Sequence, residues 1–162
     1  MPSFTVNIRP AKQADLEAIN HVIEAAVMTW TLPERVKRMS LPSYRYTLAD
    51  FEHLQMVVAE DDKYNVMGIA AWEPAEAKDI PPGHTALLLH GIYVDPAHQH
   101  QGIGRMLFSA VEQAVAKHRC SGLLVKAQED ASGFFLSQGM SRLQIEDPSR
   151  DYANRFWKRV EK

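Results

Sequence analysis

The sequence predicts a mixed α/β (α+β) fold, with a mostly antiparallel central sheet of about seven strands flanked by about four helices. Two observations carry this prediction. Apolar runs of strand length alternate with longer segments whose apolar residues recur every three or four positions. The 162 residues match the usual size of one domain, and they contain no repeat, low-complexity tract or Gly/Ser linker. We therefore expect residues 1–162 to form a single domain with the element order β-α-α-β-β-β-α-β-α-β-β.

The N-terminal segment predicts a strand followed by a helix. Phe4–Ile8 alternates apolar and polar side chains, which is typical of a strand with one buried face, and Pro10 is expected to close it. Asp15 suits the start of a helix, where a carboxylate caps backbone N–H groups. The apolar positions of this helix share one face and are Leu16, Ile19, Val22, Ile23 and Ala26.

The region from Trp30 to Tyr46 contains Pro33 and Pro42, which predict a short, broken second helix. One more helical turn is expected over residues 48–54 before the sheet resumes.

Three strands are expected in the middle of the chain. Gln55–Glu60 and Val66–Trp72 are apolar runs around a polar turn, and they predict a β-hairpin. The prolines of Glu73–Gly83 predict a loop. Thr85–Val94 is the clearest strand, because four of its first five residues are aliphatic.

The last part of the chain predicts a long helix and four short elements after it. From Ile103 the apolar residues fall in steps of three and four and define a stripe along about four helical turns. A strand over Leu123–Val125 and a short helix over Asp130–Gln138 are expected next. Arg142–Ile145 and Arg155–Val160 predict a final antiparallel pair.

The composition excludes several classes of protein. Hydrophobic residues make up 46% of the chain and charged residues 23%, which excludes an intrinsically disordered protein. A formal charge of -2 gives no positive field for nucleic acid, so no nucleic-acid partner is expected. The single cysteine, Cys120, excludes an internal disulfide. No signal-like or membrane-spanning run is evident, and we expect a cytoplasmic protein with no membrane partner.

The segment Val94–Arg105 carries the strongest functional signal. A buried strand ends there, a turn follows, and a helix begins with Gly102 and Gly104. The first backbone N–H groups of a helix have no partner within it, and the helix dipole favours an anion beside them. Glycine lets a ligand approach these groups, and no Asp or Glu between Gln99 and Arg105 supplies the anion. A phosphate or diphosphate ligand is therefore expected, with Arg105 adding positive charge.

Other interpretations of the same glycines stay open. Gly102 and Gly104 are also consistent with a simple turn into a helix, or with a nucleotide-phosphate enzyme. Leu107 stands where a dinucleotide fingerprint needs its third glycine, and no Gly-Lys-Ser/Thr marks a Walker loop.

Here the chain resembles the GNAT acyltransferase superfamily. Residues 99–104, Gln-His-Gln-Gly-Ile-Gly, match the family's acyl-CoA signature Gln/Arg-x-x-Gly-x-Gly/Ala, and Val94-Asp95-Pro96 resembles the strand end before it. The opening Ile8-Arg9-Pro10 with Asp15 is similar to the family's usual start. Residues 131–140 resemble its Ala-x-x-Phe-Tyr-x-x-x-Gly-Phe segment. The element order is similar over essentially the whole chain.

The resemblance implies a site for acetyl-CoA. Backbone amides of residues 101–105 are expected to hold its diphosphate, and the sheet is expected to splay between the fourth and fifth strands so that the pantetheine arm lies there. A splayed strand leaves backbone groups with which an amide-bearing arm can pair. The cofactor-binding residues implied are Ile92, Tyr93, Val94, Gln99, His100, Gln101, Gly102, Ile103, Gly104, Arg105, Gln128, Ser132 and Phe135.

Two residues depart from the family's pattern. Phe135 stands where the family often has a Tyr whose hydroxyl protonates the departing thiolate, and Phe has no proton to donate. Gln128 stands where the family often has Asn, a shorter amide. Ser132 or a water is left as the candidate proton donor.

Amine acylation needs a neutral nitrogen, so a general base is expected. His90 interrupts an apolar strand just before the expected splay, and free histidine titrates near neutral pH. A satisfied core histidine is the competing interpretation. Glu60 and Glu73, at the ends of neighbouring strands, are either alternative bases or solvated strand-end charges. Side chains alternate between the two faces of a strand, and Tyr93 is three positions after His90, so Tyr93 is expected to point to the opposite face.

Two further groups have weaker functional interpretations. His98 and His100 form a His-x-His pair, but no carboxylate or thiol completes a ligand set, and we expect no metal.

The region around Trp30 and Tyr44 helps to shape the acceptor pocket in the resembled family, and an ordinary packed cap is the alternative. If the basic residues there line a pocket, they favour an acceptor with a carboxylate; they are Arg35, Lys37 and Arg38.

The resemblance implies an N-acetyltransferase, an acyltransferase that moves an acetyl group from acetyl-CoA to a primary amine. The acceptor would be a small molecule or a peptide, and the amine would attack directly in a ternary complex. The alternative is a non-catalytic acyl-CoA-binding regulatory module of the same fold, which Phe135 favours. A homodimer is left open.

Overall fold

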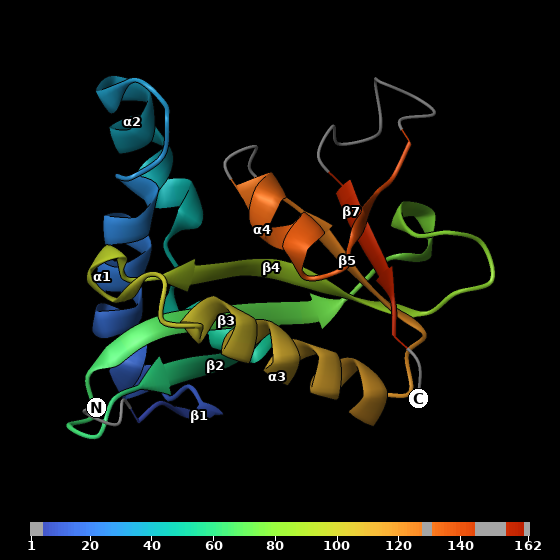
Figure 1. Ribbon diagram of the computed structural model, residues 1–162, viewed down its shortest axis with the longest axis horizontal. Helices are drawn as coiled ribbons and strands as arrows, with labels where there is room; N and C mark the ends of the chain where they lie inside the picture. The colour runs from blue at the N-terminus through green and yellow to red at the C-terminus, as the bar shows by residue number, and fades with distance from the viewer. Residues whose placement is uncertain (1–4, 128–130, 145–154, 161–162) are drawn as a thin grey trace. The chain divides into compact units, whose positions relative to one another are not determined.

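The computed structural model of the chain describes residues 5–127, 131–144 and 155–160 (Figure 1). Its helices and strands are, in chain order, β1 (Asn7–Pro10), α1 (Leu16–Val27), α2 (Glu34–Tyr44), β2 (Gln55–Glu60), β3 (Val66–Pro74), β4 (Ala86–Val94), α3 (Ile103–Lys117), β5 (Gly122–Lys126), α4 (Ser132–Ser137), β6 (Ser141–Arg142) and β7 (Arg155–Arg159). Short 3-10 turns lie between them: η1 (Gln13–Asp15), η2 (Leu48–Glu52), η3 (Ala77–Asp79) and η4 (Pro96–His98). The predicted element order is confirmed.

The strands form a seven-stranded sheet in the order β1-β2-β3-β4-β5-β7-β6. β1 pairs with β2, and β7 pairs with β5 and β6, all antiparallel. β4 pairs with β5 in parallel, from Ala86↔Gly122 to Leu89↔Val125, with α3 as the crossover between them. β4 continues to Val94, beyond this paired stretch. The mixed fold class with four helices is therefore confirmed.

The contacts of the chain group into two compact units. One comprises Met1–Ala71 with Ile92–Leu107, and the other comprises Trp72–Gly91 with Phe108–Lys162. The strands β3 and β4 and the helix α3 contribute residues to both. The expectation of a single domain over residues 1–162 stays a prediction.

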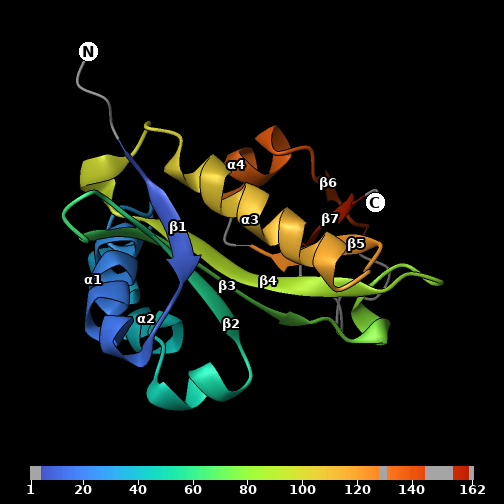
Figure 2. The same ribbon diagram turned by 90° about the horizontal axis from the view of Figure 1, so that it is seen from below.

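The core of the first unit forms where α1 and α2, which lie side by side, pack on β2 and β3 (Figures 1 and 2). The predicted apolar face of α1 is buried there at Ile19, Val22 and Ile23. Because each fully buried aliphatic side chain contributes roughly 2 kcal/mol, this face accounts for much of the helix's stability. The residues packed with it from the other elements include Leu41, Leu54, Met56, Val58 and Ile69.

The core of the second unit contains a cluster of aromatic rings. Phe135 of α4 lies between Phe134 and Phe156, with ring centroids 5.3 and 6.1 Å away, and Phe134 meets Phe108 of α3 at 6.3 Å. Figure 2 shows α3 and α4 on one side of β5 and β7. On the other side, the ring of Trp157 lies over Gly122, where any Cβ would collide with it.

Pro10 ends β1 as expected, although the strand begins at Asn7. Proline is tolerated there because β1 is the edge strand of the sheet, where a missing N–H costs no inner ladder bond. The expectation that Pro42 breaks the second helix is wrong. α2 is continuous through Pro42, because this residue lies in the last turn and removes a single helical hydrogen bond; Arg45 N still donates to Leu41 O at 3.1 Å.

Other boundaries differ by a few residues. β3 runs through Pro74 and η3 follows, so part of the expected loop over Glu73–Gly83 is a strand end and a 3-10 turn. α4 begins at Ser132, and the expected start at Asp130 lies outside the described residues. The expected end of the helix at Gly139 is confirmed, since this glycine has φ +87° directly after the C-cap residue Gln138.

Candidate active site

The turn between β4 and α3 is held by short hydrogen bonds at its start. Asp95 N donates to Met67 O on β3 at 2.8 Å, and Ala97 N donates to Asp95 Oδ1 at 3.0 Å. The chain then turns twice through the left-handed region, at His100 with φ 66° and at Gly102 with φ 80°. Histidine is one of the few residues besides glycine that occupy this region with any frequency. The turn therefore delivers the chain to α3 in a fixed direction.

The start of α3 presents a run of unpaired backbone donors. Met106 N donates to Gly102 O at 3.0 Å, so Gly102 supplies the first helical carbonyl. Within the described part of the chain, no N–H group from His100 to Arg105 donates a hydrogen bond to the protein. The first turn of α3 contains no acidic residue, and Arg105 is exposed beside it. The dipole and the free donors together favour an anion at this end of the helix.

Gly68 allows this turn to sit close to the sheet. A Cβ at position 68 would lie 2.9 Å from Leu107 Cδ1, 3.1 Å from the carbonyl oxygen of Tyr93 and 3.2 Å from Ile103 Cγ2. The absence of a side chain thus lets β3 contact both the end of β4 and the start of α3. Sequence reasoning missed this role, although a glycine inside the apolar run of β3 was a signal for close approach.

The predicted cofactor residues of this turn differ in exposure. The side chain of Ile103 is buried in the core, so only its backbone is available to a ligand. Gly104 is half-buried. The exposed members of the set are Gln99, His100, Gln101, Gly102 and Arg105.

At the end of β4, Ile92, Tyr93 and Val94 are each partly buried. Tyr93 packs against the core of the first unit. Burial raises the pKa of its hydroxyl far above the ordinary value, and neighbouring Tyr44 adds to the increase. This hydroxyl therefore stays protonated at neutral pH.

His90 and Glu73 lie together rather than serving as separate alternatives. His90 Nε2 is 3.5 Å from Glu73 Oε2, between β4 and β3. The His90 side chain is 41% exposed, so its interpretation as a buried core histidine is wrong. A half-exposed imidazole next to a carboxylate is suited to accepting a proton from a bound molecule.

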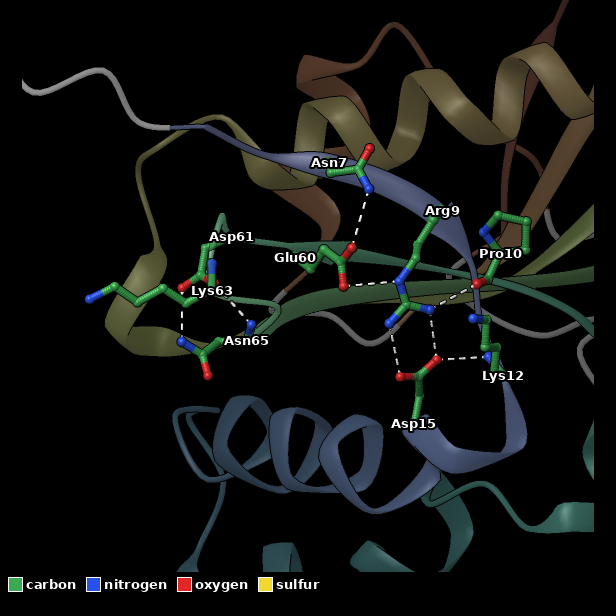
Figure 3. A network of polar contacts seen from close by, with 9 residues as sticks. All are labelled: Asn7, Arg9, Pro10, Lys12, Asp15, Glu60, Asp61, Lys63 and Asn65. Carbon is green, nitrogen blue, oxygen red and sulfur yellow. Dashed lines mark hydrogen bonds and ion pairs between the residues drawn. The ribbon is translucent and has the colours of Figure 1, made fainter.

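Glu60 belongs to a polar network that joins β2, β1 and η1 (Figure 3). Its Oε2 accepts from Arg9 Nε at 2.9 Å and its Oε1 accepts from Asn7 Nδ2 at 3.2 Å. The residue is 4% exposed, so the expectation of a solvated strand-end charge is wrong for Glu60. Both carboxylate oxygens already accept hydrogen bonds, which gives Glu60 a structural role.

Asp15 occupies the other end of the same network. Its two oxygens accept from the two terminal nitrogens of Arg9 at 2.8 and 2.9 Å, and Lys12 N donates to Oδ2 at 2.7 Å (Figure 3). The hydrogen bond from Arg9 is the main cause that holds the pKa of Asp15 below its ordinary value. Asp15 therefore caps the η1 turn and fixes Arg9, rather than capping α1 as expected.

The predicted residues near α4 have different environments. Ser132 is 7% exposed, and its hydroxyl oxygen has no hydrogen-bond partner within the described residues. Phe135 is buried in the aromatic cluster of the second unit. Gln128 lies outside the described residues.

The region around α2 is packed, and Lys37 and Arg38 both contact Glu34. The rings of Trp30 and Tyr44 meet edge to face at 5.0 Å. Lys37 Nζ donates to Met28 O at 2.8 Å and lies 3.2 Å from Glu34. These contacts are those of a packed helical cap, and a role of this region in the acceptor pocket stays a prediction.

Within residues 5–127, 131–144 and 155–160, no three His, Cys, Asp or Glu side chains gather closely enough to hold a metal ion. Across the same ranges, no helix has both the length and the apolar character needed to cross a membrane.

Solved structures with the same fold include several acetyltransferases. The PaiA N-acetyltransferase of Thermoplasma acidophilum, in complex with coenzyme A, has a TM-score of 0.75 at 13% identity and covers 96% of this chain and 99% of that chain. YhbS of Escherichia coli, a GNAT family N-acetyltransferase in complex with CoA, has a TM-score of 0.70 at 16% identity, covering 99% of this chain and 84% of that chain. At these identities the similarity establishes the fold.

Sequence comparison adds the family. No curated protein matches this chain. The family model of the acetyltransferase (GNAT) domain matches residues 52–139, which is more than half of the chain and includes the whole turn from β4 into α3. That turn, with its free amides, is the part in which the predicted signature lies. The chain therefore belongs to the GNAT acetyltransferase family.

Proposed function

We propose that this protein is an acetyl-CoA-dependent N-acetyltransferase that acetylates a primary amine of a small molecule or peptide by direct attack in a ternary complex. The observation that carries the proposal is the run of free backbone N–H groups from His100 to Arg105. Family membership and the two CoA-bound structures of the same fold support it.

The turn fits a diphosphate in both geometry and charge. Left-handed residues between ordinary ones, as at His100 and Gly102, turn successive N–H groups toward one side, which is how backbone concavities bind anions. A Cβ on Gly102 would have no atom within 4 Å, so the space beside this glycine is open. Arg105 adds a cation. When bound, acetyl-CoA supplies an acetyl group as a reactive thioester.

The end of β4 is the proposed partner of the pantetheine arm. β4 continues to Val94 after its pairing with β5 stops at Leu89. Backbone groups of Ile92, Tyr93 and Val94 would then pair with the amides of the arm, as an added strand would. Gln128, Ser132 and Phe135 stay predicted contacts of the cofactor.

His90 is the proposed general base. Most amines are protonated at neutral pH, and a group that removes this proton speeds acylation by about 10²–10⁴-fold. Glu73, 3.5 Å away, would hold the imidazole in place and stabilise it once charged. Ser132 is the proposed hydrogen-bond donor to the departing thiolate. Its buried hydroxyl has no other partner among the described residues, and the side chain of Phe135 has no hydroxyl that could donate instead.

The direct test is release of thiol from acetyl-CoA in the presence of a panel of primary amines. The proposal expects release that requires both an amine and the protein, together with an acetylated amine identified by mass spectrometry. Tight binding of acetyl-CoA without turnover of any amine would favour a non-catalytic acyl-CoA-binding module, which the missing hydroxyl at Phe135 also favours. The cytoplasmic location, the lack of nucleic-acid and membrane partners, and a homodimer stay predictions from the sequence.

A further inference from the structure

One face of the sheet in the second unit carries a row of polar side chains that sequence reasoning did not connect. Lys126 of β5 is directly opposite Arg155 of β7, and the preceding pair is Val125↔Phe156. Phe156 packs on Phe135 of α4. Because side chains alternate between faces, Lys126 and Arg155 belong to the face away from α3 and α4.

The same row includes His90. Leu89↔Val125 is the last pair of the parallel ladder of β4 and β5, and His90 and Lys126 directly follow it on their own strands, where the two strands stop pairing. Because side chains alternate along each strand, His90 and Lys126 both point to the face opposite to that of Leu89 and Val125. Glu73 of β3 reaches His90 at 3.5 Å. Four neighbouring strands thus supply Glu73, His90, Lys126 and Arg155 in that order.

The turn η3 anchors the cationic half of the row. Figure 2 shows η3 on the side of β5 opposite to α3 and α4. Arg155 is 9% exposed and donates to the carbonyl oxygens of Asp79 at 3.3 Å and Gln144 at 3.0 Å, which fixes its guanidinium. Lys126 Nζ contacts Asp79 Oδ2 at 3.5 Å, and its side chain is 36% exposed. An ammonium has three donors, so this one long contact leaves Lys126 able to bind a second anion.

We propose that this row is the acceptor site and that the acceptor is a small amine bearing a carboxylate, such as a free amino acid. This inference rests on the proposed acetyltransferase function. The amine would lie at His90 and Glu73, and the carboxylate at Lys126, with the buried positive charge of Arg155 beside it on β7. The row replaces the basic residues of α2 as the source of this specificity, since Lys37 is already bound to Glu34 and Met28.

The proposed reaction transfers one acetyl group to one acceptor molecule. His90 takes a proton from the ammonium of the acceptor. The neutral nitrogen attacks the carbonyl carbon of the acetyl thioester, a C–N bond forms, and the C–S bond breaks. The nitrogen loses its second proton to solvent, and the thiolate of CoA gains a proton. The products are the N-acetyl amino acid and free CoA.

The test compares each free amino acid with its carboxamide, which keeps the amine and removes the negative charge. Thiol release is measured for the full chain, for Lys126→Gln and for Lys117→Gln, a control that removes an exposed lysine at the end of α3. A charge-assisted hydrogen bond is worth about ten- to a hundredfold in affinity. We expect the wild type to favour at least one free amino acid over its amide by about tenfold or more in kcat/KM.

Lys126→Gln is expected to raise KM for the free amino acid by about tenfold and to leave KM for the carboxamide and for acetyl-CoA unchanged. Lys117→Gln is expected to behave as the wild type. Equal use of acids and amides, or an equal loss on both in Lys126→Gln, would overturn the inference while the transferase stands. If no amine releases thiol, the proposed function fails first. In that case the melting temperature of the protein is measured with CoA and each N-acetyl amino acid. A higher melting temperature with at least one of them supports the inference, and an unchanged melting temperature with all of them overturns it.

Discussion

Individual side chains of this protein acquire their roles from partners that are distant in the sequence. Glu60 looks like an ordinary charge at a strand end, yet it is buried against Arg9, 51 residues away. His90 and Glu73 look like competing bases, yet they contact each other. A sequence shows which residues have useful chemistry, but the partner that decides between a base and a structural anchor is set by the pairing of strands.

At the residue scale, His90→Ala tests the proposed base. Loss of the base is expected to lower kcat by about a hundredfold or more while KM for acetyl-CoA stays the same. His118→Ala, at the exposed end of α3, is the matched control and is expected to have wild-type kinetics. Steady-state kinetics at several pH values measure both. Unchanged turnover in His90→Ala across this range would remove His90 from the mechanism.

Asp15→Asn tests the network of Figure 3 through its pH dependence. The Arg9 hydrogen bonds lower the pKa of Asp15 from 3.8, so their contribution to stability is complete above that pH and is lost as the pH falls through the folded-state pKa. Near neutral pH the variant is expected to be less stable by about 1–3 kcal/mol in urea unfolding.

The difference in stability between the wild type and Asp15→Asn should shrink as the pH falls below 3.8. Asp62→Asn, an exposed neighbour of the hairpin turn, serves as the control and is expected to have no such effect. A stability difference that stays constant down to acidic pH would contradict the role given to Arg9.

At the scale of elements, apolar periodicity was a more reliable guide than proline. The stripe beginning at Ile103 predicted α3 to the residue at its start, because burial of one face dictates that spacing. Pro10 ends β1 as expected, but Pro42 does not break α2. Their cost depends on whether the lost N–H would have had a partner, and that depends on the edge position of β1 and on the last turn of α2.

Gly102→Ala tests the turn between β4 and α3. Alanine is strained by about 1 kcal/mol at a left-handed position, and its methyl group would enter the open space beside the free N–H groups. The variant is expected to bind CoA about tenfold more weakly by calorimetry.

Gly83→Ala is a matched control for Gly102→Ala. Gly83 has φ 83°, is exposed and has equally open surroundings, but it lies in the loop before β4. Both variants are expected to lose similar stability, and Gly102→Ala alone is expected to lose CoA affinity. Equal affinities for CoA in the two variants would mean that the turn at Gly102 does not contact the ligand.

At the scale of the whole molecule, the order of elements sufficed to predict a mixed sheet, and resemblance to one family predicted that its fourth and fifth strands are neighbours that splay apart. The order of strands and the register of β4 with β5 were not available from the residues alone, because many registers satisfy the same apolar pattern. The row from Glu73 to Arg155 depends on that register. This is why Lys126 and Arg155 escaped sequence reasoning, although both are visible as charges at strand ends.

The central claim is that the amides from His100 to Arg105 bind the diphosphate of CoA, and NMR of the uniformly labelled chain tests it most directly. On titration with CoA, the largest amide shifts and the greatest slowing of hydrogen exchange are expected at these residues. The same concentration of ATP should produce smaller changes there. If CoA left these amide signals unmoved, or if it moved another part of the chain instead, the account of this site would be wrong.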